Sequence, residues 1–127
     1  MTIIGLGLDA TEIDRVGGLI DRYGERFLNR VFTEGEIAYC RRRRGQAAVA
    51  SFAARFAAKE AAMKAMGVGL GEVRFRDLEV RRADSGAPSL VVTGGAAELA
   101  GSLGIVRWHL SLSHSDLIAQ AFVVAEG

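Results

Sequence analysis

The sequence has little of what disulfide-bonded or membrane-inserted proteins are built from. Its 127 residues include one cysteine, Cys40, and aromatic residues make up only 7% of the chain. One thiol cannot form an internal disulfide, and no signal peptide or long apolar run is present, so we expect a protein of the reducing cytoplasm. Cys40 stands beside arginines with no histidine close by, and we interpret it as structural rather than nucleophilic.

An excess of charge of one sign is also missing. Sixteen Lys and Arg residues face fifteen Asp and Glu residues, for a formal net charge of +1. This balance lacks the basic footprint of a dedicated nucleic-acid-binding protein. Arg41 to Arg44 are a local exception, and a small RNA-binding module using them is one alternative. However, no aromatic residues for base stacking are interleaved, and such a run is usually a solvated surface. We therefore expect neither nucleic acid nor membrane as a partner.

What is present fits one soluble globular domain spanning residues 1–127, since half of the residues are hydrophobic. Helices and strands alternate irregularly, which predicts an α+β fold with a mainly antiparallel sheet packed against a long central helix. The predicted elements are a strand over 3–9, helices over 11–23, 33–44 and 47–66, strands over 75–80 and 89–93, a helix over 96–103 and a hairpin over 108–125. A capping box, Thr33 with Glu36, opens the second helix.

The long helix carries charge where it should bury hydrocarbon. At about 100° per residue, one narrow arc holds Phe52, Phe56, Met63 and Met66. Lys59 projects from the middle of this arc, with Glu60 on its flank. Lys59 can lay its methylenes on the core with its ammonium in water. The alternative is that an acid and two lysines on a rigid helix form a site for a divalent cation and phosphate.

Two acids are candidates for such a cation site. Asp9 ends a glycine-marked strand and Glu60 lies on the packed helix. Two carboxylates from rigid elements suit magnesium, which keeps waters and phosphate oxygens in its other positions. Spacing alone leaves two simpler interpretations open. Asp9 can cap the following helix, and Glu60 can form an i, i+4 ion pair with Lys64.

Lys64 and the glycines at 67, 69 and 71 offer an ammonium and open backbone amides to an anion. The loop does not match the GxxxxGK[ST] phosphate motif, and the C-terminal end of a helix repels anions, so we favour Lys64 over the loop. His114 ends an apolar strand face, where a histidine is more often structural. Ser113, His114 and Asp116 do not form a hydrolase triad, because neighbours on a strand point to opposite faces.

Five segments, weak singly and specific together, occur in one order along nearly the whole chain. They are Gly5-Leu6-Gly7-Leu8-Asp9 with Glu12 and Arg15, Phe32-Thr33-Glu34-Gly35-Glu36, Arg55-Phe56-Ala57-Ala58-Lys59-Glu60-Ala61 with Lys64, Gly86-Ala87-Pro88, and His109-Leu110-Ser111-Leu112-Ser113-His114-Ser115. In these segments the sequence resembles the holo-acyl-carrier-protein synthases, the small group among the 4'-phosphopantetheinyl transferases. The turn before Pro88 departs from the family pattern, with Ala87 in place of a basic residue and Ala83-Asp84 in place of an Asn.

The resemblance implies the 4'-phosphopantetheinyl transferase fold and a magnesium-dependent transfer in fatty acid or polyketide synthesis. A serine of an apo-acyl carrier protein attacks the β-phosphorus of coenzyme A, which gives holo-carrier protein and adenosine 3',5'-bisphosphate. Asp9 and Glu60 would hold Mg²⁺, Lys64 would add positive charge, and Glu60 would also take the serine proton.

The resemblance also implies contacts to the partners. Lys64 would contact the diphosphate oxygens of coenzyme A. Its nucleotide part would touch Gly67, Gly69, Leu70, Pro88 and His114. Arg15 and Arg22 would pair with an acidic helix of the carrier protein. Family members of this size are homotrimers with active sites between subunits. A magnesium-dependent nucleotide phosphohydrolase, using the same carboxylates with water as nucleophile, is the alternative enzyme.

Overall fold

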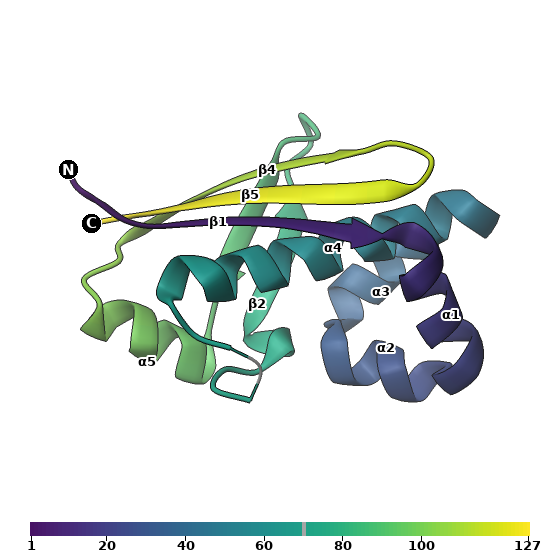
Figure 1. The fold of residues 1–127 in the computed structure, drawn as a ribbon, viewed down its shortest axis with the longest axis horizontal. Coiled ribbons are helices and arrows are strands. Elements are labelled where there is room, and N and C mark those ends of the chain that lie inside the picture. The colour runs from purple at the N-terminus through teal and green to yellow at the C-terminus, as the bar shows by residue number, and fades with distance from the viewer. Residues whose placement is uncertain (70) are drawn as a thin grey trace.

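The predicted α+β architecture is confirmed in the computed structural model, which describes residues 1–69 and 71–127 (Figure 1). In chain order the elements are β1 (Ile3–Glu12), α1 (Ile13–Tyr23), α2 (Glu25–Val31), α3 (Glu34–Cys40), α4 (Gly45–Met66), the 3-10 turn η1 (Phe75–Asp77), β2 (Leu78–Arg82), β3 (Pro88–Val92), α5 (Gly94–Ser102), β4 (Arg107–His114) and β5 (Ile118–Glu126). No helix in the described part of the chain combines the length and the apolar character that a bilayer crossing requires.

The main sheet has three antiparallel strands in the order β1-β5-β4, and β2 and β3 form a separate antiparallel hairpin. Along β1 the side chains alternate between two faces. The face with Asp9 and Thr11 is buried, whereas Leu6 and Leu8 on the other face are exposed. The buried face lies against α4, which runs along the sheet in Figure 1.

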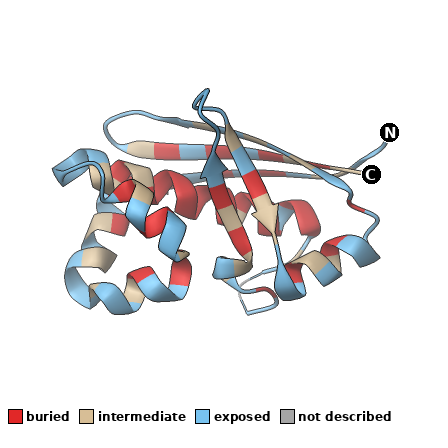
Figure 2. Ribbon diagram, turned by 180° about the vertical axis from the view of Figure 1, so that it is seen from behind, coloured by how far each residue is buried: buried red, intermediate tan, exposed pale blue. Residues whose placement is uncertain are grey.

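Helix α4 is the centre of the molecule. Buried residues follow it along most of its length (Figure 2), on both of the faces that it presents to neighbouring elements. One cluster joins the C-terminal half of α4 to the sheet and the β2–β3 hairpin, and a second joins its N-terminal half to α1, α2 and α3. The expectation of a single narrow apolar arc was therefore wrong. The many alanines of α4 let neighbouring elements approach it from several directions, as in a helix at the middle of a core.

Two glycines of β1 bring the strand into direct backbone contact with α4. A Cβ atom on Gly7 would lie 1.7 Å from the carbonyl oxygen of Ala61, and one on Gly5 would lie 1.8 Å from that of Ala65. These distances leave no space for a side chain, so glycine is required at both positions. The strand and the helix are as close as their backbones allow.

Several predicted boundaries were wrong for local reasons. Thr11 does not start a helix, because β1 continues to Glu12 and the Thr11 hydroxyl donates to Asp9 instead. Gly24 ends α1 as predicted, with φ of 57°, but a seven-residue helix, α2, follows at once. Gly45 opens α4 rather than ending α3. The capping box of Thr33 and Glu36 at the start of α3 is confirmed.

Candidate active site

Asp9 lies in the C-terminal part of β1 with both carboxylate oxygens held. Oδ2 accepts a hydrogen bond of 2.7 Å from the Thr11 hydroxyl, and Oδ1 accepts one of 3.0 Å from Lys64 Nζ. The residue is only 9% exposed. Asp9 thus does not cap the following helix, and its orientation is fixed toward α4.

Lys64 connects α4 to this strand. Its ammonium donates to the Leu8 carbonyl at 2.9 Å as well as to Asp9, while 54% of its side chain stays exposed. The ammonium therefore bonds to β1 and does not form the i, i+4 ion pair with Glu60 that the sequence left open. An exposed ammonium beside a fixed carboxylate is free to turn toward an anion at the surface.

Glu60 lies one helical turn before Lys64, on the same side of α4. Burial raises the pKa of its carboxyl above the usual 4.5, and the nearby Asp9 carboxylate raises it further, while Arg15 and Lys64 act in the opposite sense. Two carboxylates near enough to repel each other form a site that favours a cation. The residues predicted as metal ligands, Asp9 and Glu60, thus lie within electrostatic reach of each other.

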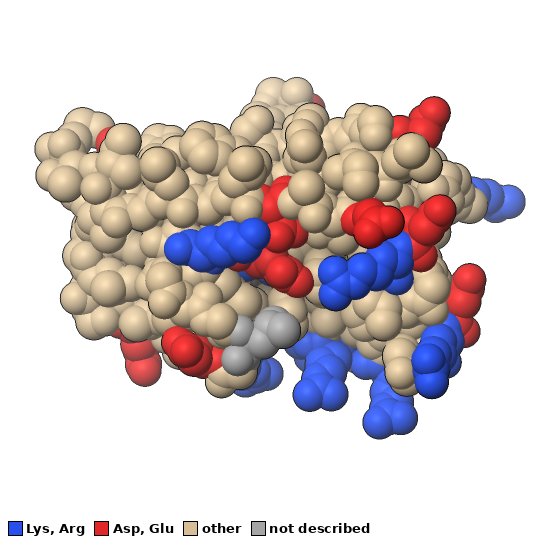
Figure 3. Space-filling model, viewed as in Figure 1, with Lys and Arg blue, Asp and Glu red and all other residues tan. Residues whose placement is uncertain are grey.

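One face of the molecule groups acidic and basic side chains. In Figure 3 acidic side chains gather at the middle of the face, with basic side chains on both sides. Arg15, on α1, lies within electrostatic reach of Glu60. The prediction for Arg15 was contact with the carrier protein; its charge also acts on the Glu60 carboxyl.

The donor set fits magnesium better than a metal held entirely by protein. No group of three or more His, Cys, Asp or Glu side chains that might enclose a metal is found in residues 1–69 and 71–127. Magnesium in phosphate-handling sites is held by one or two carboxylates and completes its shell with waters and phosphate oxygens. Asp9 and Glu60 match that donor set in number and in chemistry.

A second polar region surrounds His114, at the end of β4. A pocket of about 70 Å³ lies beside it, and its polar lining is Tyr39, Arg43, Ser51, Arg55, Arg82 and His114. Its described lining contains three arginines and no acid. The pKa of the Tyr39 hydroxyl reflects the positive charge of these arginines. Burial acts to raise its pKa, but a hydrogen bond from Arg43 and the charges of Arg82 and Arg55 lower the pKa overall. This pocket is suited to an anion.

Arg55 is the least expected member of this pocket. It is 2% exposed, its guanidinium lies 4.3 Å from the centre of the Tyr39 ring, and one of its terminal nitrogens donates to Ser51 Oγ at 2.9 Å. Its buried Nε has no hydrogen-bond partner among the described residues. One feature of the sequence could have indicated this role: Arg55 stands among alanines, with no acidic residue one helical turn away to pair with it.

The two regions lie on different sides of α4. Five residues at about 100° each place Arg55 roughly 140° around the helix from Glu60. Pro88 belongs with the second region, since it pairs across the hairpin with Arg82. Gly67 ends α4 three residues after Lys64, and Gly69 lies in the loop that follows. Leu70, the remaining predicted contact, lies outside the described residues.

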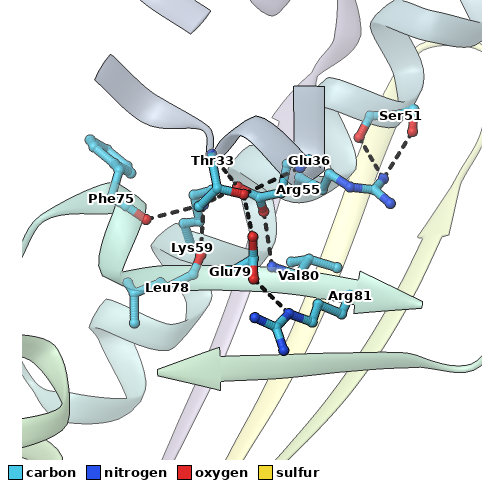
Figure 4. Close-up of polar contacts among 10 residues, drawn as sticks. All are labelled: Thr33, Glu36, Ser51, Arg55, Lys59, Phe75, Leu78, Glu79, Val80 and Arg81. Carbon is cyan, nitrogen blue, oxygen red and sulfur yellow. Dashed lines mark hydrogen bonds and ion pairs between the residues drawn. The ribbon is translucent and has the colours of Figure 1, made fainter. Parts of the chain in front are cut away.

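Lys59 is not part of either region, so the expectation that two lysines serve one phosphate site was wrong. Its side chain is fully buried, and its three N–H groups have three acceptors (Figure 4). Nζ donates to Glu36 Oε1 at 2.7 Å, to the Leu78 carbonyl at 2.6 Å and to the Phe75 carbonyl at 3.1 Å. Snorkelling was wrong as well, because no part of the side chain reaches water.

Glu36 is the residue that sequence reasoning underestimated. Besides completing the capping box with Thr33, it accepts from the backbone N–H of Val80 at 2.9 Å and pairs with Lys59. Thr33 in turn donates to Glu79. Burial lowers the pKa of Lys59, and the charges of Glu36 and Glu79 oppose that shift. The network joins α3, α4 and β2 and is structural.

The predicted carrier-protein contacts both lie on α1. Arg15 and Arg22 are seven residues apart and so share a face of the helix. The Arg22 guanidinium lies 5.3 Å from the centre of the Tyr23 ring. A groove of about 360 Å³ runs beside it, lined by Leu19, Tyr23, Arg26, Phe27 and Arg30. A surface that combines arginines with apolar side chains is suited to an acidic, amphipathic partner.

Comparison with known proteins identifies the class to which this fold and site belong. The family model of the 4'-phosphopantetheinyl transferase superfamily matches residues 5–123. A holo-[acyl-carrier-protein] synthase of Koribacter versatilis is 49% identical over 125 residues, which make up 98% of each chain.

Solved structures agree. The holo-[acyl-carrier-protein] synthase of Neisseria meningitidis has a TM-score of 0.89 at 33% identity, covering 99% of this chain and all of that one. The Helicobacter pylori holo-[acyl-carrier-protein] synthase, in complex with coenzyme A, has a TM-score of 0.83 at 30% identity, covering 95% of this chain and 99% of that one. This chain is an enzyme of the holo-[acyl-carrier-protein] synthase family within that superfamily.

Proposed function

We propose that residues 1–127 act as one domain that transfers the 4'-phosphopantetheine group of coenzyme A to a serine of an apo-acyl carrier protein. The products are holo-carrier protein and adenosine 3',5'-bisphosphate, and the reaction requires Mg²⁺. One observation carries the proposal. In a chain of this family, Asp9 is paired with the half-exposed ammonium of Lys64 and lies within electrostatic reach of the Glu60 carboxyl.

Each residue of this cluster has a role in the reaction. Asp9 and Glu60 hold the cation, which when bound neutralises charge on the diphosphate. Lys64 turns its ammonium from Asp9 to the same phosphate oxygens. Glu60 takes the proton of the carrier serine as the serine oxygen bonds to the β-phosphorus and the bond to the bridging oxygen breaks.

Coenzyme A also carries a 3'-phosphate, and the pocket beside His114 suits it. Arg43, Arg55 and Arg82 supply positive charge there, and the unpartnered Nε of Arg55 is a donor in need of an acceptor. The Helicobacter pylori relative, solved with coenzyme A, supports a coenzyme A site in this fold. His114 and Pro88 would thus contact the nucleotide end.

Because α4 separates the two regions, one coenzyme A molecule is proposed to lie between two copies of the chain. One copy supplies Asp9, Glu60 and Lys64, and its neighbour supplies the arginine pocket. The outer face of the sheet offers an interface, since Leu6, Leu8 and Phe122 are 56%, 61% and 44% exposed. A closed ring of three copies, the homotrimer expected from the sequence, accommodates this head-to-tail arrangement.

The carrier protein is proposed to dock on α1, where Arg15 and Arg22 meet its acidic helix. Arg15 on that face is near enough for its charge to lower the pKa of Glu60, so a carrier bound there would bring its serine toward the proposed proton acceptor. A carrier of fatty acid synthesis is the substrate we propose, and the cytoplasm remains the predicted compartment.

Intact-mass analysis of an apo-acyl carrier protein incubated with the enzyme, coenzyme A and Mg²⁺ tests the function. We expect addition of one phosphopantetheine group. Asp9→Asn and Glu60→Gln should each slow conversion by at least about 100-fold, because each removes a charged cation ligand. Glu98→Gln, which neutralises an exposed acid of α5, should react at the wild-type rate. Wild-type conversion by either site variant would contradict the assignment.

A further inference from the structure

We propose that Gly5 and Gly7 are positioning residues of the cation site, because they set the distance between the strand that carries Asp9 and the helix that carries Glu60 and Lys64. The inference rests on the proposed function. It adds that the distance between the two ligands is set by contact between the backbones of β1 and α4, and not by the ligand side chains themselves.

The geometry places each glycine beside a functional residue. Gly7 is two residues before Asp9, and the Ala61 carbonyl that it touches follows Glu60 in the chain. Gly5 touches the Ala65 carbonyl, and Ala65 follows Lys64. Each contact therefore connects the backbone near one ligand to the backbone near another.

Added bulk at Gly7 cannot be absorbed by a side-chain movement. The atoms nearest to a Cβ there are the carbonyl oxygen and carbon of Ala61, at 1.7 and 2.6 Å, and the backbone nitrogen of Ala65, at 3.1 Å. All belong to the backbone of a central helix buried on both sides. Relief requires β1 and α4 to separate by more than about 1 Å.

A separation of that size matters for magnesium. Magnesium demands near-ideal octahedral geometry with ligands at about 2.0–2.1 Å, and a functional site tolerates displacements of only about 0.5 Å. Calcium accepts longer bonds of about 2.3–2.6 Å and variable geometry. Moving Asp9 away from Glu60 should weaken binding of the smaller ion more than that of the larger one.

The two glycines should differ in effect. The pairing of β1 with β5 shifts register between Ile3 and Gly5, so the strand is already irregular at that end. An outward shift of this end absorbs part of the strain at Gly5. Toward Asp9 the register with β5 is regular, with Gly7 opposite Val123 and Asp9 opposite Ala121. Substitution at Gly7 should therefore displace Asp9 more than substitution at Gly5.

The test is calorimetric titration of Mg²⁺ and of Ca²⁺ into enzyme with coenzyme A and no carrier protein, so that no turnover occurs. The variants are Gly7→Ala, Gly5→Ala and Leu90→Ala, with folding checked by the near-ultraviolet signal of Trp108. Leu90→Ala creates a cavity in the β2–β3 hairpin, and controls for lost stability without changing the β1–α4 contact.

We expect Gly7→Ala to bind Mg²⁺ at least about 10-fold more weakly than the wild type, with a much smaller change for Ca²⁺. Gly5→Ala should show a smaller change in the same direction, and Leu90→Ala should keep both affinities. A folded Gly7→Ala with wild-type Mg²⁺ affinity overturns the inference. If Gly7→Ala does not fold, Gly5→Ala decides, and Mg²⁺ affinity equal to that of Leu90→Ala overturns it.

Failure of the proposed function gives a different result. If the wild-type enzyme with coenzyme A binds no Mg²⁺, the cation site itself is rejected, whatever the glycine variants do. If the wild type binds Mg²⁺ and the glycine variants bind it equally well, only the role of Gly5 and Gly7 is rejected.

Discussion

At Glu60, burial and the neighbouring Asp9 carboxylate raise the pKa of the side chain, while the charges of Arg15 and Lys64 act in the opposite sense. Because the net shift is upward, the folded protein binds this proton more tightly than the unfolded chain does. Stability linked to the site is thus greatest below the usual pKa of 4.5 and falls as the pH rises through the folded-state pKa. The charge needed for cation binding destabilises the metal-free fold.

This balance predicts that Glu60→Gln raises the midpoint of thermal unfolding at neutral pH in the presence of a chelator, although it removes activity. The gain should shrink as the pH is lowered from about 8 to about 4, because the wild-type carboxyl then becomes protonated too. Thermal scans of both proteins across that range make the measurement. Glu98→Gln should show no such pH-dependent gain, and a variant less stable than wild type at neutral pH would refute the argument.

The residues of the site were only partly predictable. Asp9 and Glu60 were assigned through resemblance to a family, whereas spacing alone left a helix cap and an ion pair open. Lys64 pairs with Asp9 rather than with Glu60 because α4 lies against β1. This contact joins residues far apart in the sequence, so spacing along the helix did not predict it. The arginine pocket was missed except for His114, since its members come from α3, the turn that follows α3, α4, β2 and β4.

Among the elements, the Lys59–Glu36 pair holds α3 and the start of β2 against α4. Both side chains are fully buried, and a buried charge that loses its partner is costly. Glu36 has two further backbone donors, Thr33 and Val80, so its place in the network does not depend on Lys59 alone.

We predict that Lys59→Met destabilises the protein by about 3–5 kcal/mol, because it leaves the Glu36 carboxylate buried without its ammonium. Combining it with Glu36→Gln should recover part of this loss, so that the double variant is more stable than the two single effects added together. Urea unfolding of the four proteins measures the coupling.

A partly exposed pair on β4 and β5 serves as the control for that cycle. Arg107 lies 3.7 Å from Glu126 with 61% of its side chain exposed. Arg107→Met should change stability by less than about 1 kcal/mol. Equal effects of Lys59→Met and Arg107→Met would contradict the role given to the buried pair.

Element prediction succeeded where the signal was local. The Thr33–Glu36 capping box fixes the start of α3, and both of its hydrogen bonds form. It failed for α2, because a seven-residue helix directly after the stop signal at Gly24 has too few residues for a periodic pattern. Gly45 looked like a stop and proved to be a start, since glycine is compatible with either end of a helix.

For the whole molecule, the separation of the two regions by α4 predicts complementation between inactive chains. Asp9→Asn damages the cation region, and Arg82→Ala with His114→Ala damages the nucleotide pocket. If the chain forms the proposed homotrimer, about a quarter of the sites in mixed trimers should combine the intact half of each chain. Activity should therefore return when the two inactive proteins are co-expressed, as measured by the rate of carrier modification.

Mixing Asp9→Asn with Glu60→Gln is the matched control. Both changes fall in the same half of the site, so no combination of chains restores it. If the first mixture is as inactive as the control, coenzyme A binds within a single chain and the arrangement between copies is wrong.

Lys59 and Lys64 are the only lysines of this chain, and their surroundings are opposite. The ammonium of Lys59 donates all three of its N–H groups to acceptors inside the protein, whereas more than half of the Lys64 side chain is open to water. An acylating reagent that reacts with amines would thus meet one accessible lysine, beside the proposed cation ligands. Covalent labelling at that position becomes a direct gauge of whether the site is occupied.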